Sequence, residues 1–198
     1  MKVNAKFLRG AVEVGQFPPP GPPEIAFLGR SNVGKSSVIN SLLGEKMAKT
    51  SSTPGRTRTI NFFEVRRPGQ PRAEWLFVDL PGYGYAKLPR EQTAEWPKFI
   101  EPYLKQRETL VLCIVLVDSQ IAAQASDKQL VEWLQHVGRK FVIVATKSDR
   151  MSGNKLTSSL QTLRREYQTE RIVPFSARTG AGREEVWREI RAAVLPSS

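Results

Sequence analysis

A phosphate-binding loop constrains this chain more than any other stretch of its sequence. Residues 29–36 read Gly-Arg-Ser-Asn-Val-Gly-Lys-Ser, the pattern G-x-x-x-x-G-K-S, and they directly follow the apolar run 25–28. Glycines in such a loop let successive backbone N–H groups turn toward a polyphosphate, and the helix that follows adds the positive end of its dipole. The pattern predicts a nucleotide site in which Lys35 contacts the β- and γ-phosphates and Ser36 binds Mg²⁺.

Apolar runs and amphipathic segments alternate along the rest of the chain, which predicts an α/β fold. We expect the three-layer sandwich of a P-loop NTPase, with a mostly parallel sheet of six strands. One of these strands is antiparallel, because the short connection between residues 59–65 and 73–80 predicts a hairpin. The other expected strands are 24–28, 110–118, 140–145 and 172–175, and the expected helices are 35–43, 91–107 (bent by prolines), 127–138, 155–167 and 182–194.

Domain boundaries follow from composition. Five prolines between residues 18 and 23 cannot form a helix or an interior strand. Residues 1–23 are therefore interpreted as an N-terminal lead-in with a Pro-rich connector, followed by one nucleotide-binding domain over residues 24–195.

A second phosphate-sensing motif ends the strand expected at 73–80. Asp79-Leu80-Pro81-Gly82 reads D-x-x-G, in which Asp79 would hold the metal through water and the Gly82 N–H would meet the γ-phosphate. Tyr83 follows, and a phenol cannot orient an attacking water as a glutamine amide does. Slow intrinsic hydrolysis is expected.

A base-reading motif ends the strand expected at 140–145. Thr146-Lys147-Ser148-Asp149 resembles N-K-x-D, with threonine in place of asparagine. A carboxylate at Asp149 accepts hydrogen bonds from N1–H and the amino group of guanine, two donors that adenine lacks. The Lys147 stem would pack over the base, and the backbone of Phe175-Ser176-Ala177 would meet the guanine O6. These motifs predict guanine rather than adenine.

The polar segment 46–58 suits a switch loop that closes on Mg²⁺ and the γ-phosphate. Thr57 is the candidate metal ligand in preference to Thr53. From Lys46 to Arg72 the chain has seven Lys or Arg and one acid, Glu64.

Composition limits the kinds of partner and the cellular compartment that are expected for this chain. The chain has 198 residues and a net charge of +11 at pH 7, which indicates a polyanionic partner such as nucleic acid or an anionic membrane surface. A single cysteine, Cys113, excludes a disulfide framework. With no apolar run long enough to span a bilayer and no signal-peptide pattern, a soluble, cytoplasmic protein is expected, a monomer by default.

Together these strings resemble the EngB (YihA/YsxC) family of bacterial GTPases, within the TrmE-Era-EngA-EngB-septin-like group. The resemblance spans roughly residues 1–195 and rests most on Thr53-Pro54-Gly55-Arg56-Thr57 and on the string from Asp79 to Ala86. It implies a Mg²⁺-dependent GTPase that acts in large ribosomal subunit assembly, with no membrane partner. It also implies a protein necessary for normal cell division and septation.

The resemblance also assigns site residues. It implies Mg²⁺ on Ser36 and Thr57, and Lys35, Thr57 and Gly82 as the residues that act on the γ-phosphate. Arg58 and the segment 119–123 depart from the family pattern and leave the partner surface open. The implied nucleotide contacts are Gly29, Arg30, Ser31, Asn32, Val33, Gly34, Lys35, Ser36, Gly55, Arg56, Thr57, Arg58, Thr59, Asp79, Leu80, Pro81, Gly82, Thr146, Lys147, Ser148, Asp149, Phe175, Ser176 and Ala177.

Two questions stay open at this point. Charge stabilisation during hydrolysis could come from a K⁺ ion that Asn32 helps to bind, or from Arg56 acting as a finger in cis. The switch could act on the ribosome, or it could recognise a protein of the division machinery through Tyr83 and Tyr85. A P-loop ATPase or nucleotide kinase is a more distant alternative, disfavoured by Asp149.

Overall fold

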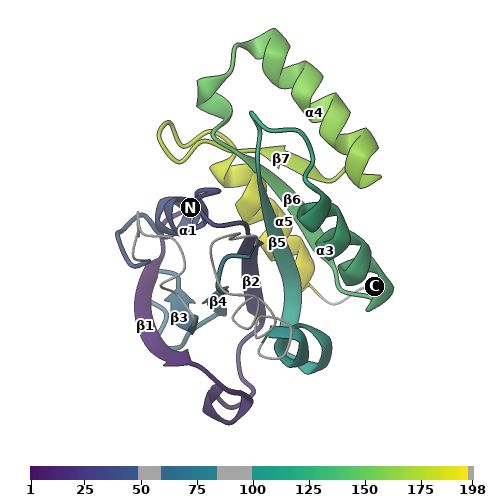
Figure 1. The fold of residues 1–198 in the computed structure, drawn as a ribbon. Helices are drawn as coiled ribbons and strands as arrows, with labels where there is room; N and C mark the ends of the chain where they lie inside the picture. The colour runs from purple at the N-terminus through teal and green to yellow at the C-terminus, as the bar shows by residue number, and fades with distance from the viewer. Residues whose placement is uncertain (49–58, 84–99, 196–198) are drawn as a thin grey trace.

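A twisted sheet with helices on both faces is the centre of the fold (Figure 1). The computed structural model describes residues 1–48, 59–83 and 100–195. In this part of the chain the sheet has seven strands in the order β1-β3-β4-β2-β5-β6-β7. They are β1 (Asn4–Ala11), β2 (Glu24–Gly29), β3 (Ile60–Arg66), β4 (Trp75–Asp79), β5 (Leu110–Asp118), β6 (Phe141–Thr146) and β7 (Ile172–Pro174).

The direction of the strands agrees with the expectation from the hairpin. β3 pairs antiparallel with both β1 and β4, whereas β2, β4, β5, β6 and β7 pair in parallel. Within the described residues, β3 is thus the one strand that runs opposite to all the others. The α/β fold and the mostly parallel sheet are confirmed.

The number of strands is corrected from six to seven, because residues 4–11 of the expected lead-in form the edge strand β1. Phe7 packs edge-on against Phe63 of β3, with ring centroids 5.7 Å apart. The sequence conceals this strand, since a register shift between Phe7 and Arg9 interrupts its alternation of apolar and polar residues. A short 3₁₀ helix, η1 (Val14–Gln16), follows before the prolines.

The helices cover the two faces of the sheet. Side chains of α1 (Lys35–Leu43) and α5 (Arg183–Val194) pack with Phe27, Phe77 and Leu116 on one face. Those of α3 (Ala125–His136), α4 (Gly153–Tyr167) and helical residues 100–106 pack on the other. The rest of the expected helix 91–107 lies outside the described residues. Cys113 is buried in β5, where burial raises the pKa of its thiol to about 12, so its role is packing.

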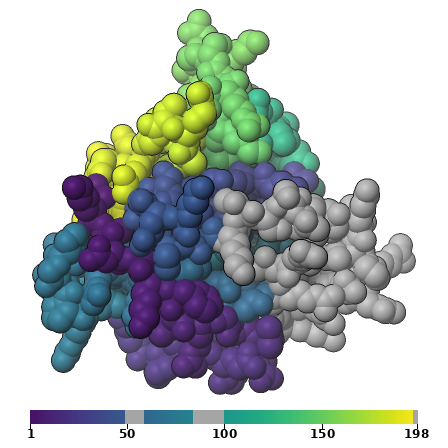
Figure 2. All heavy atoms as spheres, turned by 90° about the vertical axis from the view of Figure 1, so that its left-hand side faces the viewer, coloured from purple at the N-terminus to yellow at the C-terminus, as the bar shows by residue number. Residues whose placement is uncertain are grey.

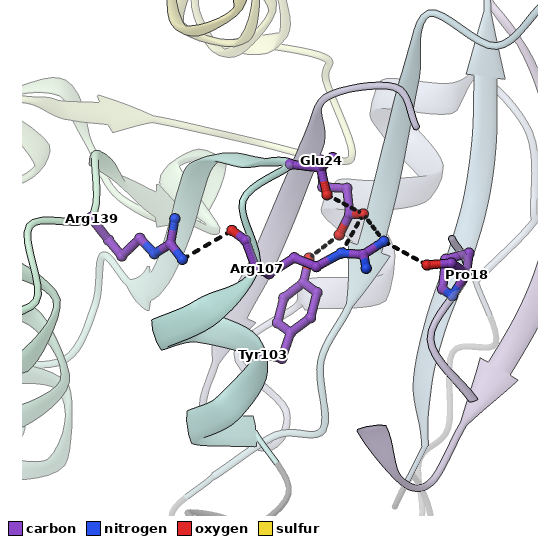
Figure 3. Close-up of polar contacts among 6 residues, drawn as sticks. Pro18, Glu24, Tyr103, Arg107 and Arg139 are labelled. Atoms are coloured by element: carbon purple, nitrogen blue, oxygen red, sulfur yellow. Dashed lines mark hydrogen bonds and ion pairs between the residues drawn. The ribbon is translucent and has the colours of Figure 1, made fainter. Parts of the chain in front are cut away.

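A buried polar network ties the start of β2 to the segment before β5 (Figure 3). Glu24 is fully buried and accepts hydrogen bonds from Arg107 Nε at 2.8 Å and from Tyr103 Oη at 2.8 Å. Thr109 Oγ1 donates to the same carboxylate at 2.7 Å, and Arg107 also donates to the Pro18 carbonyl. Such a charge is tolerated because it is paired and its oxygens are hydrogen-bonded. The network fixes the end of β2 opposite the phosphate-binding loop.

Candidate nucleotide-binding site

The phosphate-binding loop connects β2 to α1 as expected. β2 is buried along its whole length and ends at Gly29, and α1 begins at Lys35. A Cβ at Gly29 would lie 2.8 Å from Val33 Cγ1, so the loop folds back too closely for any larger residue. Asn32 and Gly34 both have positive φ, at 65° and 103°, the turn conformation that such a loop requires.

Lys35 forms an ion pair with Asp79, which ends β4 beside β2. Both side chains are largely buried. The parallel register of β2 and β4 brings these two predicted residues together although 44 positions separate them in the chain. A cation and a carboxylate therefore meet at the point where the sequence predicts a triphosphate and its metal.

The D-x-x-G motif lies against the phosphate-binding loop. Ser31 N donates to the Tyr83 carbonyl at 3.1 Å, and Tyr83 N donates to the Gly29 carbonyl at 3.4 Å. A Cβ at Gly82 would lie 3.1 Å from Ser31 N, which explains the glycine. Leu80 and Pro81, which precede Gly82 in the motif, are buried. The two predicted phosphate-sensing segments are thus in direct contact.

The Tyr83 side chain packs against the core beside Asp127 of α3. Burial raises the pKa of the Tyr83 hydroxyl well above its usual range, and the Asp127 carboxylate adds to the shift. The phenol is thus kept neutral and held by the core. This placement agrees with the expectation that Tyr83 does not take over the work of a water-orienting glutamine.

The base-reading loop is tied to the phosphate-binding loop. The Thr146 hydroxyl, in the position where the motif has asparagine, lies 2.7 Å from the Val33 carbonyl and 3.1 Å from the Val117 carbonyl. Lys147 has a positive φ of 59°, and its ammonium group donates to the Asn32 carbonyl at 3.2 Å. Threonine therefore keeps a direct hydrogen bond between the two loops.

The Asp149 carboxylate is held by two donors. Ser176 Oγ lies 2.6 Å from Oδ1, and Arg178 Nε lies 2.8 Å from Oδ2. The Ser176 hydrogen bond and then the Arg178 guanidinium hold the pKa of Asp149 below its ordinary value. Asp149 follows Ser148 in a short 3₁₀ helix, η2 (Ser148–Arg150). An ionised carboxylate at this place is an acceptor for the two adjacent donors of guanine.

Phe175 and Ser176 are buried, and Ala177 is exposed. Phe175 N donates to the Ala145 carbonyl at 2.8 Å, and Ser148 N donates to the Phe175 carbonyl at 3.2 Å. The third base-contacting segment is thereby fixed beside the second.

Some predicted contacts are not described by the structure. Gly55, Arg56, Thr57 and Arg58 lie outside the described residues, so the first switch and its metal ligand stay predictions. Thr59 is described and half-buried.

Sequence reasoning missed two residues of the site. Asp118 ends β5 and accepts a hydrogen bond from Lys147 Nζ at 2.6 Å. Its place at the carboxyl end of a central strand was a signal that it would join the loops there. Arg178 had no such signal, because its partner Asp149 is 29 positions away.

Comparison with known proteins places these motifs in a family. A family described as "50S ribosome-binding GTPase" matches residues 24–147. The "Probable GTP-binding protein EngB" of Koribacter versatilis is 59% identical over 190 residues, covering 96% of this chain and 94% of the relative. The protein of that name from Acidobacterium capsulatum is 56% identical, with 96% and 90% covered. This chain belongs to the EngB family of GTPases.

Solved structures agree on the fold. A crystal structure of a probable GTP-binding protein EngB superposes with a TM-score of 0.71 at 22% identity, covering 86% of this chain and 98% of that one. Era in complex with MgGDPNP and nucleotides of 16S ribosomal RNA gives the same TM-score at 21% identity, with 89% and 58% covered. As an EngB GTPase, the protein binds guanine nucleotides and hydrolyses GTP. In the described residues, no helix has the length and apolar character to cross a membrane.

Proposed function

We propose that this EngB GTPase is a GTP-controlled switch in assembly of the large ribosomal subunit. The match of residues 24–147 to the 50S ribosome-binding GTPases carries this proposal. Two observations support it: Era, which shares the fold, has been crystallised with ribosomal RNA, and this chain has a net charge of +11 at pH 7. We further propose that the protein is necessary for normal cell division and septation, as a consequence of its action in ribosome assembly in the cytoplasm. A monomer is the expected working form.

The site residues are proposed to act as their motifs imply. Backbone groups of residues 29–36 bind the phosphates, Gly82 N–H meets the γ-phosphate, and Asp149 reads guanine. Ser36 in the first turn of α1 and Asp79 at the end of β4 offer hydroxyl and carboxylate oxygens, the hard donors that suit Mg²⁺. Ser36 and Thr57 would bind the ion directly, Asp79 through water. When bound, it neutralises charge on the β- and γ-phosphates.

Hydrolysis is proposed to proceed by in-line attack of water on the γ-phosphorus, with no covalent enzyme intermediate. Lys35 leaves the Asp79 carboxylate to contact the phosphates, and Gly82 donates to the γ-phosphate. Because Tyr83 is held by the core, the position after Gly82 supplies no glutamine-like group to orient the water, and intrinsic turnover is proposed to be slow. The missing charge stabilisation comes from K⁺ at Asn32, from Arg56 or from a partner. Loss of the γ-phosphate then relaxes the switch segments.

A second candidate is a switch that binds a protein of the division machinery without ribosome contact. Co-sedimentation with purified large ribosomal subunits separates the two, with a non-hydrolysable GTP analogue or GDP at low and moderate salt. We expect the GTP form to sediment with subunits more than the GDP form. If neither form sediments at any salt, the ribosome proposal is wrong and the division partner is favoured.

A further inference from the structure

We propose that the β1 edge of the sheet is an RNA-binding surface that contacts backbone phosphates. Its basic strip consists of Lys6 and Arg9 on β1, Arg66 at the end of β3, and Arg72 in the turn after β3. This inference rests on the proposed function and names the surface by which the protein would meet ribosomal RNA.

A β-bulge places Lys6 and Arg9 on the same face of the sheet. Lys6 pairs with Glu64 and Arg9 with Phe62, and the register shifts between them. Residues three positions apart in a regular strand point to opposite faces, whereas directly opposed residues of an antiparallel pair share a face. Because Glu64 and Phe62 are two positions apart on β3, their partners lie on one face. The bulge at Leu8 thus turns Arg9 to the side of Lys6.

The strip continues along β3 toward its turn. Arg66 is two positions beyond Glu64, on the same face, and its guanidinium donates to the Pro71 carbonyl at 3.3 Å. This contact places it beside Arg72, which is exposed. Phe62, the β3 residue opposite Arg9, lies four residues before Arg66 on the same strand. Four residues of a strand span about 14 Å. A surface of this length follows a nucleic-acid strand rather than a single phosphate.

The charges of the strip are not neutralised by the described residues. All four side chains are exposed, and none forms an ion pair with an acid of the described chain; Glu64, half-buried on the same face, is not within ion-pair distance of Lys6. Elsewhere in the described chain, Arg164, Arg171 and Arg178 are each paired with an acid, whereas Lys155 and Arg165 of α4 are exposed and form no ion pair, like the strip residues. Unpaired cations are those available for phosphates.

Figure 2 looks onto this side of the molecule, where the purple atoms of β1 lie uncovered and the blue-green β3–β4 turn lies to one side. Cations on an edge strand also prevent edge-to-edge pairing of two copies. That role accounts for Lys6 and Arg9 but not for Arg66 and Arg72, which belong to the neighbouring strand and its turn. RNA accounts for all four.

The strip begins beside Thr59, the residue that follows the predicted first switch in the chain. Gly10, next to Arg9, packs so closely on Thr59 that a Cβ there would lie 2.6 Å from Thr59 Cγ2. RNA on the strip would therefore lie near Thr59, one of the predicted nucleotide contacts.

The test compares two variants of equal charge. Lys6→Gln/Arg9→Gln removes two cations of the strip, and the control Lys155→Gln/Arg165→Gln removes two exposed cations of α4. Binding of each to extracted large-subunit ribosomal RNA is measured between 50 and 200 mM KCl (about the range over which phosphate contacts weaken strongly), and GDP affinity is measured to verify folding. We expect the negative slope of log K against log salt to become less steep by about 1.4–1.8 in the strip variant and to stay unchanged in the control.

Each other outcome has a distinct meaning. If the two variants weaken RNA binding equally, bulk charge is responsible and the strip is not the site. The assignment is also overturned if the strip variant binds RNA like the wild type but dimerises, or loses binding only to anionic lipid vesicles. If the wild-type protein binds neither the RNA nor large subunits, the proposed function itself is wrong.

Discussion

The Ser176 hydroxyl donates to the Asp149 carboxylate across 2.6 Å, joining two loops that follow β6 and β7. This hydrogen bond orients the carboxylate that we propose distinguishes guanine from adenine, and Arg178 holds its other oxygen. Both donors favour the ionised carboxylate, which is the form that accepts hydrogen bonds from the base.

Asp149→Asn is expected to weaken GDP binding by at least about 100-fold, because two charge-assisted hydrogen bonds to guanine are lost. The new amide can donate to the C2 carbonyl of xanthine, so affinity for xanthosine diphosphate is expected to rise. Titration calorimetry with both nucleotides checks this. Glu184→Gln on α5, an equal charge change away from the site, serves as the control. Unchanged GDP affinity in Asp149→Asn would remove Asp149 from the base site.

The pH dependence of Asp149 follows from its lowered pKa. Its interaction with Ser176 and Arg178 is fully present above the ordinary carboxyl value of 3.8 and is lost only as the pH falls through the lower folded value. Arg178→Ala removes one of the two side chains that lower the pKa of Asp149, so the folded pKa moves upward toward 3.8. NMR titration of the Asp149 carboxyl carbon in both proteins measures the shift. A downward shift, or none, would contradict the contact.

Lys35→Ala is expected to reduce GTP affinity by about 10- to 100-fold, since a charged donor to the phosphates is lost. The affinity for GTP is expected to fall more than the affinity for GDP, because Lys35 reaches the γ-phosphate. Fluorescence of N-methylanthraniloyl nucleotides gives both constants. Lys46→Ala, an exposed lysine after α1, is the control. Equal losses for GTP and GDP would mean that Lys35 does not contact the γ-phosphate.

The choice between K⁺ and Arg56 is decided by kinetics. If Asn32 helps to bind K⁺, turnover in potassium buffer exceeds that in sodium buffer at equal ionic strength, and Asn32→Ala abolishes the difference. If Arg56 is the finger, Arg56→Ala lowers turnover in both buffers. Phosphate release under single-turnover conditions measures each rate. Equal rates in sodium and potassium would exclude the first hypothesis, and unaltered partner-stimulated turnover in Arg56→Ala would exclude the second.

The Glu24 network (Figure 3) is expected to contribute to the free energy of unfolding and not to nucleotide binding or hydrolysis. Glu24→Gln leaves Arg107 without its charged partner in a buried place, and removing one member of such a pair costs about 3–5 kcal/mol. Urea unfolding measures the loss. The control is Glu74→Gln, which breaks the more exposed pair with Arg67 and is expected to change the transition little. Comparable effects of the two variants would show that burial does not set the cost.

Much of the site could be predicted from the sequence, because each motif is short and local. A G-x-x-x-x-G-K-S loop requires only its own backbone turn, and Gly29 and Gly34 show the close packing and the positive φ that such a turn needs. Long apolar runs such as 110–118 identify buried parallel strands without any partner being known. The alternation of such runs with helices therefore determined the fold class, and the motifs after each strand determined the ligand.

Only the tertiary structure decided what distant segments do to one another. Lys35 meets Asp79, and Lys147 meets Asp118, because parallel register aligns strand ends that are far apart in the chain. The edge strand β1 was hidden, since its pairing with β3 depends on a bulge that erases the two-residue period. That same bulge brings Lys6 and Arg9 to one face. Local sequence patterns indicate which secondary structure a segment favours. A surface formed by two strands exists only after the strands pair, so no local pattern predicts it.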